Sequence, residues 1–292
     1  MTHSSVKAIV SDMDGTLLTS SGTIHPSDLH IIRNLHKEGM YFFIATGRHI
    51  NFVLPFIQMI GCEYVDAVIS LSGAAVYIGS DLTLLHQIPI SQNQAFNLVS
   101  YMKTTNANGS IYTEHIPFFH HAPKEEEPGP LEFFADQKLL YTYKKDYFHL
   151  EDYKPGLGGN ILKCAITNQS MRFFDTFCDR FSALSLCIYP HTDDTFSCEI
   201  TNASVDKTAG LQTAAAYYQL SLSDLLTIGD SRNDLDMLEA AGYAATPRHS
   251  SILSDGSLTP KELNIALYHS HPVFITSDHN TGILKNIMEH LL

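Results

Sequence analysis

Two aspartates stand close together near the start of the chain, directly after a short apolar run. Asp12 and Asp14 are separated by Met13 and followed by Gly15, which lets the backbone bend sharply. Two carboxylates at this spacing can divide the work of group transfer. One attacks an electrophile, while the other protonates the leaving oxygen and later activates water. The pair therefore points to nucleophilic catalysis with acid–base assistance.

The remaining polar candidates match the needs of phosphate monoester chemistry. A phosphate dianion repels nucleophiles, so a site must neutralise charge and hold the attacking atom in line. A carboxylate nucleophile is itself anionic and needs Mg²⁺, which prefers oxygen ligands and usually takes one or two protein carboxylates. Asp230 and Asp234 are the distant acidic groups that can supply such ligands. Lys207 supplies a compact cation, and Thr46 with Gly47 offers a hydroxyl and a backbone N–H.

Short apolar runs precede these polar groups and are typical of buried parallel strands. The runs cover residues 6–10, 41–45, 67–71 and 225–228, with further candidates at 243–245 and 273–275. Helical patterns lie between them, so we predict an α/β fold with a doubly wound, Rossmann-like parallel-sheet core. Ligands bind beyond the carboxyl ends of the strands in such sheets. Three strands would deliver Asp12, Thr46 and Asp230 to that edge.

The middle of the chain has a different pattern, which we interpret as a second α/β domain inserted into the first. Helices are expected near residues 93–103 and 171–181, and strands near 110–114, 161–167, 186 and 196. Residues 123–130 form a loop by composition. We therefore predict a catalytic core of residues 1–83 and 199–292, and an inserted cap, residues 84–198, that sets substrate specificity.

The composition fits a globular protein and disfavours several other classes. Of 292 residues, 44% are apolar and 17% charged, and the formal net charge of -13 argues against a broad basic surface for nucleic acid. The five cysteines form no C-x-x-C pair, which favours free thiols in a reducing compartment. We see no secretory signal and no run of roughly 20 apolar residues. We expect a cytoplasmic protein, a monomer or weak homodimer, that binds neither nucleic acid nor membrane.

Four motifs, taken in order, resemble those of the haloacid dehalogenase superfamily. They are residues 12–16 (Asp-Met-Asp-Gly-Thr), residues 46–48 (Thr-Gly-Arg), Lys207, and residues 229–234 (Gly-Asp-Ser-Arg-Asn-Asp). Their spacing resembles the Cof-type, sugar-phosphatase-like hydrolases of that superfamily, which carry a large α/β cap between the second and third motifs. The resemblance covers most of the chain, including residues 161–163 in the expected cap and 281–283 near the end.

The resemblance implies a role for each motif residue. Asp12 would be the nucleophile and Asp14 the general acid/base, with Thr46 and Lys207 completing the catalytic set. The metal would be Mg²⁺, held by Asp12, the Asp14 backbone carbonyl and Asp230, with Asp234 close by or coordinating. The residues that would hold the substrate are Met13 through its backbone, Thr46, Gly47, Arg48, Lys207 and Asn233. The implied activity is hydrolysis of small phosphate monoesters, sugar phosphates or phosphorylated cofactors, through an aspartyl-phosphate intermediate.

Two segments depart from the family pattern. Residues 72–74 are Ser-Gly-Ala where many relatives have Asn-Gly-Ala, and residues 245–249 replace a usual Met-x-Asn-Ala segment. Both departures bear on the identity of the substrate rather than on hydrolysis. His115, His120 and His121 lack a recognised metal-ligand spacing, so we interpret them as part of a cap loop that packs or meets substrate.

Two other functions stay open at this point. One is a phosphosugar mutase, which transfers a phosphoryl group between positions of a sugar and resembles this architecture. The other is a non-catalytic protein that binds a phosphorylated metabolite. Intact Asp12 and Asp14 argue against the second, because a binding protein needs no nucleophile.

Overall fold

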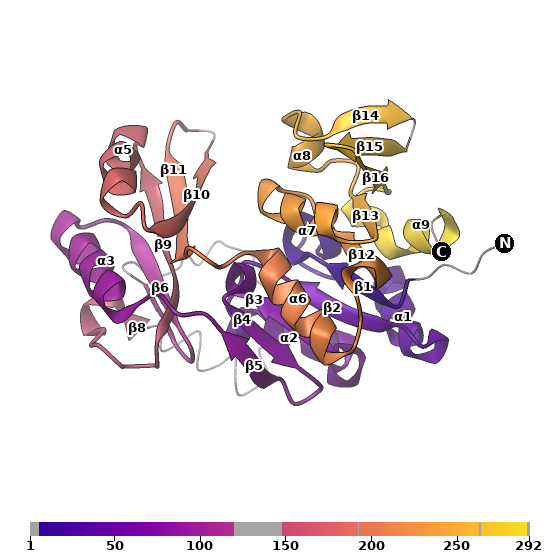
Figure 1. Cartoon of the computed structure of the whole chain (residues 1–292), viewed down its shortest axis with the longest axis horizontal. Helices are drawn as coiled ribbons and strands as arrows, with labels where there is room; N and C mark the ends of the chain where they lie inside the picture. Colours follow the sequence, from indigo (N-terminus) through magenta and orange to yellow (C-terminus); the bar gives the residue numbers. More distant parts are fainter. Residues whose placement is uncertain (1–5, 120–147, 192, 263, 291–292) are drawn as a thin grey trace. The chain divides into compact units, whose positions relative to one another are not determined.

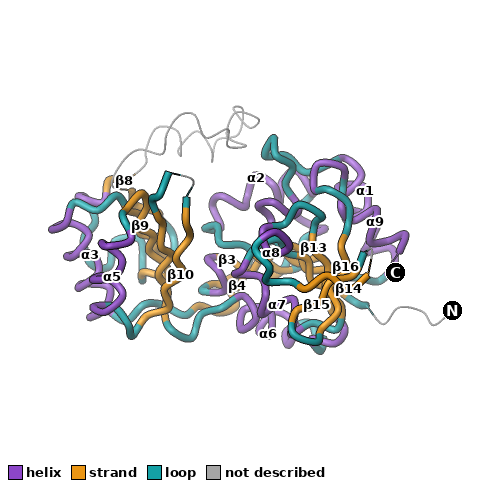
Figure 2. The backbone as a smooth tube through the Cα atoms, turned by 90° about the horizontal axis from the view of Figure 1, so that it is seen from above, coloured by secondary structure: helices purple, strands orange, loops and turns teal. Residues whose placement is uncertain are grey.

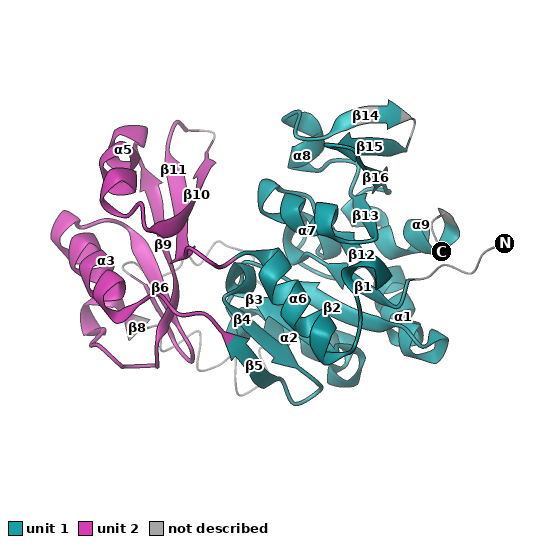
Figure 3. Ribbon diagram, viewed as in Figure 1, with its two compact units in different colours: residues 1–86, 206–292 teal, residues 87–205 magenta. Residues whose placement is uncertain are grey.

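The structure is a computed structural model of the chain, and it describes residues 6–119, 148–191, 193–262 and 264–290 (Figure 1). The contacts divide the chain into two compact units (Figure 3). Unit 1 comprises Met1–His86 and Asp206–Leu292, and unit 2 comprises Gln87–Val205. The loop expected at residues 123–130, together with His120 and His121, lies outside the described residues.

Unit 1 is built on a ten-stranded sheet with a parallel centre. The central strands are β1 (Ala8–Ser11), β2 (Tyr41–Ala45), β3 (Ala67–Ser70), β12 (Leu225–Ile228), β13 (Tyr243–Thr246) and β16 (His271–Ile275). The marginal strands are β4 (Ala75–Ile78), β5 (Thr83–Gln87), β14 (Thr259–Glu262) and β15 (Ile265–Tyr268). The spatial order is β14-β15-β16-β13-β12-β1-β2-β3-β4-β5, with parallel pairing from β16 to β3. This arrangement confirms the predicted α/β fold with a parallel-sheet core.

The strand order reverses between β1 and β12. From β1 the chain proceeds outward through β2 and β3, whereas β12, β13 and β16 extend in the opposite direction. The register aligns Ser11 with both Ile228 and Ile44, so the three strands end at nearly the same level. A reversal of this kind is where open α/β sheets bind ligands, beyond the carboxyl ends of the strands.

Helices cover both faces of the unit 1 sheet (Figure 2). One face carries α1 (Pro26–Leu35), α2 (Ile50–Ile60) and α9 (Ile283–His290), and the opposite face carries α6 (Lys207–Tyr217) and α7 (Leu235–Ala240). Every residue of β1, β3 and β12 is buried as a result. Burial on both faces explains why these strands are apolar without alternation.

Unit 2 is a six-stranded sheet with helices packed against it through a separate core. Its strands are β6 (Gly109–Thr113), β7 (Pro117–Phe119), β8 (Phe148–His149), β9 (Ile161–Gln169), β10 (Leu184–Pro190) and β11 (Phe196–Asn202). Their order is β10-β11-β9-β6-β7-β8, antiparallel except between β7 and β8. The core joins the sheet to α3 (Gln92–Thr105) and α5 (Met171–Arg180), through residues such as Met102, Phe177 and Ile111.

The start of α6 packs directly against the turn that follows β3. Gly73 in this turn has φ +104°, and a Cβ on it would lie 2.0 Å from the Asp206 carbonyl oxygen. On the helix side, a Cβ on Gly210 would lie 3.1 Å from the Gly73 Cα. Asp206 caps α6 by accepting a hydrogen bond from the Ala209 N–H at 2.7 Å. Two glycines and one cap therefore fix the position of Lys207, the first residue of the helix.

We predict that Gly73→Ala destabilises unit 1 by more than backbone strain alone. The left-handed conformation costs a residue with a Cβ roughly 1–2 kcal/mol, and the collision with Asp206 adds to that cost. Gly39→Ala is the matched control, since Gly39 has φ +74° with no atom within 4 Å of an added Cβ. Urea unfolding should show the larger loss in free energy of unfolding for Gly73→Ala. Equal losses would mean that the contact with α6 is not tight.

Candidate active site

Asp12 lies at the carboxyl end of β1, where the strand order reverses. Its backbone N–H donates to the Ile228 carbonyl oxygen at 2.9 Å, which ties it to the end of β12. Its side chain is buried, and Oδ1 accepts a hydrogen bond from Lys207 Nζ at 2.6 Å. The predicted nucleophile is thus held from two directions, by the neighbouring strand and by the first residue of α6.

Lys207 sits between two carboxylates. Nζ donates at 2.6 Å to Asp12 Oδ1 and at 2.6 Å to Asp234 Oδ1, and only 2% of the side chain is exposed. Burial alone would lower the pKa of Lys207, but the charges of Asp12 and Asp234 outweigh it and hold that pKa above its usual value. The ammonium is therefore permanently charged and fixed in place.

Asp234 holds both Lys207 and the loop after β12. Oδ1 accepts from Lys207, while Oδ2 accepts from the Asp230 N–H at 3.1 Å and from the Ser231 N–H and Oγ at 3.0 Å each. Ser231 and Asp234 form a capping box at the short 3₁₀ turn Arg232–Asp234. Both oxygens thus have protein donors, so the contacts favour a role for Asp234 in positioning its neighbours.

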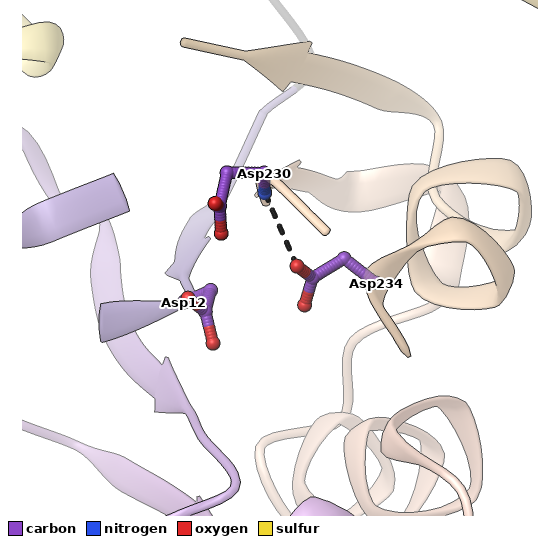
Figure 4. Close-up of side chains that lie close together, drawn as sticks. All are labelled: Asp12, Asp230 and Asp234. Atoms are coloured by element: carbon purple, nitrogen blue, oxygen red, sulfur yellow. Dashed lines mark hydrogen bonds between the residues drawn. The ribbon is translucent and has the colours of Figure 1, made fainter. Parts of the chain in front are cut away.

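Asp230 completes a cluster of three carboxylates (Figure 4). Asp12, Asp230 and Asp234 each place one oxygen within 4.8 Å of the others. Burial, with the nearby charge of Asp234, raises the pKa of Asp230 to about 7. Burial also raises the pKa of Asp12 well above its ordinary value against the opposing charge of Lys207, and the other two carboxylates add to the rise. Such a cluster is disfavoured in its fully ionised form unless a cation joins it.

The donor set fits a hard divalent cation such as Mg²⁺. All three side chains offer carboxylate oxygens, the ligands that Mg²⁺ prefers. Within the described residues, the one hydrogen bond that the Asp230 carboxylate accepts is long, 3.4 Å from Thr16 Oγ1 to its Oδ1. A Cβ on Gly15 would lie 2.5 Å from Asp230 Oδ2, so glycine at that position keeps the space beside this oxygen clear. Asp12 and Asp230 are therefore the better candidates for ligands, since Asp234 is committed to protein donors.

Asp14 lies outside the cluster of three aspartates and is paired with Arg48. Arg48 Nε donates to Asp14 Oδ2 at 2.7 Å and Nη2 donates to Oδ1 at 2.5 Å. The Asp14 side chain is 58% exposed and that of Arg48 28%. Thr46, buried just past β2, accepts a hydrogen bond on Oγ1 from the Arg48 N–H at 3.2 Å, and Gly47 lies between them in the chain.

The other predicted site residues are placed as follows. Met13 is completely buried, and Asn233 accepts a hydrogen bond on Oδ1 from Ser231 Oγ at 2.5 Å. His115 belongs to unit 2, and its Nε2 lies 3.9 Å from Oε2 of Glu114. Within the part of the chain that the structure describes, the cluster of three aspartates is the one group of three or more His, Cys, Asp or Glu side chains whose ligand atoms lie close enough to share an ion.

Sequence reasoning did not assign roles to three hydroxyl residues near the cluster. Ser231 donates to Asp234 and Asn233, Ser251 Oγ donates to the Asp230 carbonyl oxygen at 2.9 Å, and Thr16 approaches Asp230. The Ser-x-x-Asp spacing of Ser231 and Asp234 is a capping-box signal that could have identified the first. Ser251 has no comparable signal, because its contact depends on the placement of a later turn.

Comparison with known proteins identifies the family. Residues 9–246 match the model of the haloacid dehalogenase-like hydrolases, and the chain belongs to that family. Phosphatase YwpJ of Bacillus subtilis is 22% identical over 286 residues, 91% of this chain and 99% of its own length. The pyridoxal phosphate phosphatase YbhA of Escherichia coli is 23% identical over 253 residues, 81% of this chain and 85% of its own. The predicted family and enzyme class, a haloacid dehalogenase-like phosphatase of the Cof type, are confirmed.

Solved structures share the fold over the whole chain. A haloacid dehalogenase-like hydrolase from B. subtilis superposes with a TM-score of 0.75 at 19% sequence identity. The match covers 98% of this chain and 100% of the B. subtilis chain. None of the helices in the described ranges is long and apolar enough to cross a membrane.

We predict that the metal-free protein loses stability as the pH rises towards neutrality. The folded-state pKa of Asp230 is about 7, above the roughly 3.9 of an unfolded aspartate. The folded chain therefore binds a proton that the unfolded chain releases in this window. The contribution of the Asp230 proton to the free energy of unfolding is fully present below about pH 4. It falls by up to about 1.4 kcal/mol per pH unit as the pH rises to about 7.

Urea unfolding in EDTA at a series of pH values measures this slope. Asp230→Asn should make the slope shallower, because the amide does not titrate, while the raised pKa of Asp12 leaves a residual slope of the same sign. Saturating Mg²⁺ should restore stability near pH 7, because the carboxylates of Asp12 and Asp230 can both ionise around a bound cation. A slope that is the same in wild type and Asp230→Asn would assign the effect to another group.

Proposed function

We propose that this protein is a Mg²⁺-dependent phosphatase that hydrolyses small phosphorylated metabolites through an aspartyl-phosphate on Asp12. One observation carries the proposal: a buried Asp12, fixed by Lys207, lies beside Asp230 at the reversal of the strand order. A buried carboxylate that is ready to attack and a permanent ammonium beside it are what phosphoryl transfer to an aspartate requires.

In the first step, Asp12 attacks phosphorus. Lys207 binds Oδ1, which leaves Oδ2 as the attacking atom. The new O–P bond forms as the ester O–P bond breaks, and Asp14 gives a proton to the leaving oxygen. When bound, Mg²⁺ offsets the repulsion between the nucleophile and the phosphoryl oxygens, and Asp12, Asp230 and the Asp14 backbone carbonyl would hold it.

In the second step, water attacks the phosphorus of the aspartyl-phosphate. Asp14, now a carboxylate, takes the proton from that water, and the bond from phosphorus to Asp12 breaks to release inorganic phosphate. Thr46, Gly47 and Asn233 are proposed to bind the phosphoryl oxygens through a hydroxyl, a backbone N–H and an amide. Asp12 and Asp14 then return to their starting states, so no co-reactant beyond water is consumed.

The proposed substrate class rests on the relatives of this chain and on its net charge. YbhA is named for pyridoxal phosphate, a phosphorylated cofactor, and the family resemblance adds sugar phosphates. We propose that unit 2 supplies the residues that distinguish one leaving group from another. The net charge of -13 makes a polyanionic substrate such as nucleic acid a poor fit.

The test is phosphate release from a panel of sugar phosphates and phosphorylated cofactors, with Mg²⁺ or with EDTA. Release should need Mg²⁺ and should fall by roughly 10³-fold or more in Asp12→Asn, which keeps the shape of the side chain but removes the nucleophile. Turnover that survives in Asp12→Asn would refute the mechanism. Formation of a phosphosugar isomer without phosphate would identify a mutase, and tight binding without either product would identify a binding protein.

The intermediate can be trapped with Asp14→Asn. With p-nitrophenyl phosphate, whose leaving group needs no proton, the first step should proceed while the second is slowed. Intact-protein mass spectrometry should then show the addition of one phosphoryl group, absent in the Asp12→Asn/Asp14→Asn double variant.

A further inference from the structure

The contacts of Arg48 differ from those expected of a residue that binds the phosphoryl group. Two of its N–H groups, on Nε and Nη2, already donate to the two oxygens of Asp14. This side-on fork is the geometry in which guanidinium and carboxylate match best. We propose that Arg48 is the positioning residue of the general acid/base, so that proton transfer rather than phosphoryl binding depends on it. The inference rests on the proposed role of Asp14.

Arg48 is itself firmly held, which makes it a suitable anchor. Its carbonyl oxygen accepts hydrogen bonds from Ser70 Oγ at 2.7 Å and from the Leu71 N–H at 3.0 Å. Its guanidinium carbon lies 5.4 Å from the ring centroid of Phe56, a buried residue of α2. Contacts from β3, from the turn after it and from α2 thus fix the backbone and side chain of Arg48.

Asp14, by contrast, needs an anchor. Its side chain is 58% exposed, so without a partner it would sample several rotamers. Its neighbour Gly15 has φ +74°, and the backbone between Met13 and Leu17 turns tightly at this point. The fork selects one orientation of the carboxylate from those that such an exposed side chain could adopt.

The fork also leaves Asp14 able to react. A carboxylate has about four lone-pair sites, and the two bonds from Arg48 use one on each oxygen. One lone pair on each oxygen remains to hold or accept a proton. In the first step that proton passes to the leaving oxygen, and in the second it comes from water, while the Arg48 contact can persist throughout.

Leaving-group dependence tests the proposal. An alkyl phosphate such as glycerol 3-phosphate needs a proton on its leaving oxygen, whereas p-nitrophenyl phosphate does not. We expect Arg48→Gln to lower the ratio of kcat/KM for the alkyl ester to that for the aryl ester by about tenfold or more, because acid–base catalysis typically contributes 10²–10⁴-fold. Arg48→Lys keeps the charge but loses the fork, and its ratio should lie between those of wild type and Arg48→Gln.

Two controls make the result specific. In an Asp14→Asn background, Arg48→Gln should leave the ratio unchanged, since the group that it positions is already gone. Arg33→Gln, in unit 1, removes an arginine that donates to the Ile60 and Met59 carbonyl oxygens rather than to a carboxylate, and should leave the ratio at its wild-type value.

The outcomes separate this inference from the proposed function. An equal loss for both esters in Arg48→Gln would mean that Arg48 binds the phosphoryl group or only supports the fold, and would overturn the inference. A ratio that stays the same or rises would also overturn it. Wild-type protein with no Asp12-dependent hydrolysis of either ester would instead overturn the proposed function itself.

Discussion

The ion pair between Lys207 and two buried aspartates is the interaction on which the site depends. Three carboxylates gather at the end of the parallel sheet, and Lys207 is the cation bonded to two of them. Removing one partner from a buried pair leaves an uncompensated charge, which is strongly destabilising. One ammonium does not balance three carboxylates, and the pKa values of Asp12 and Asp230 are raised, first by burial and then by the charges of the neighbouring carboxylates. A divalent cation bound at the cluster, as proposed above, would offset this excess of negative charge.

The fold brings the carboxylates and the ammonium together from segments that are far apart in the sequence. Asp12 follows β1 and Asp230 follows β12, strands that are adjacent in the sheet but far apart in sequence. Lys207 comes from the start of α6, which the close contact of Gly73 with Asp206 brings against the turn after β3. A substitution at Gly73 can thus disturb the ammonium without touching the carboxylates.

Most of the strands and helices that position the site could be predicted from the sequence, because the apolar patterns that indicate them are local. The apolar runs ending at Asp12, Thr46 and Asp230 identified the strands, and the structure has β1, β2 and β12 at those positions. The two helices expected in the middle of the chain are α3 and α5. Short marginal strands such as β14 and β15 were not foreseen, because four-residue strands with mixed polarity lack a clear period.

The contacts within the site were harder to predict because they depend on rotamers and on long-range placement. From its position in the motif, Asp234 is predicted to be a metal ligand or a helix cap. The structure shows that both its oxygens accept hydrogen bonds from protein donors. The motif predicts that Arg48 binds substrate, and in the structure its guanidinium donates to Asp14, which follows a different strand. No local pattern encodes that pairing.

The two cations differ in a way that follows from their partners. Lys207 must fit between two carboxylates in a buried space, and a compact ammonium can donate to both at 2.6 Å. Arg48 faces a single exposed carboxylate, where an ammonium would allow rotation but a planar fork fixes the plane of the carboxyl group. A nucleophile needs charge compensation at one oxygen, whereas a proton donor needs its orientation fixed. In the proposed mechanism, lysine beside Asp12 and arginine beside Asp14 therefore suit the two carboxylates to different roles, nucleophile and acid/base, in one reaction.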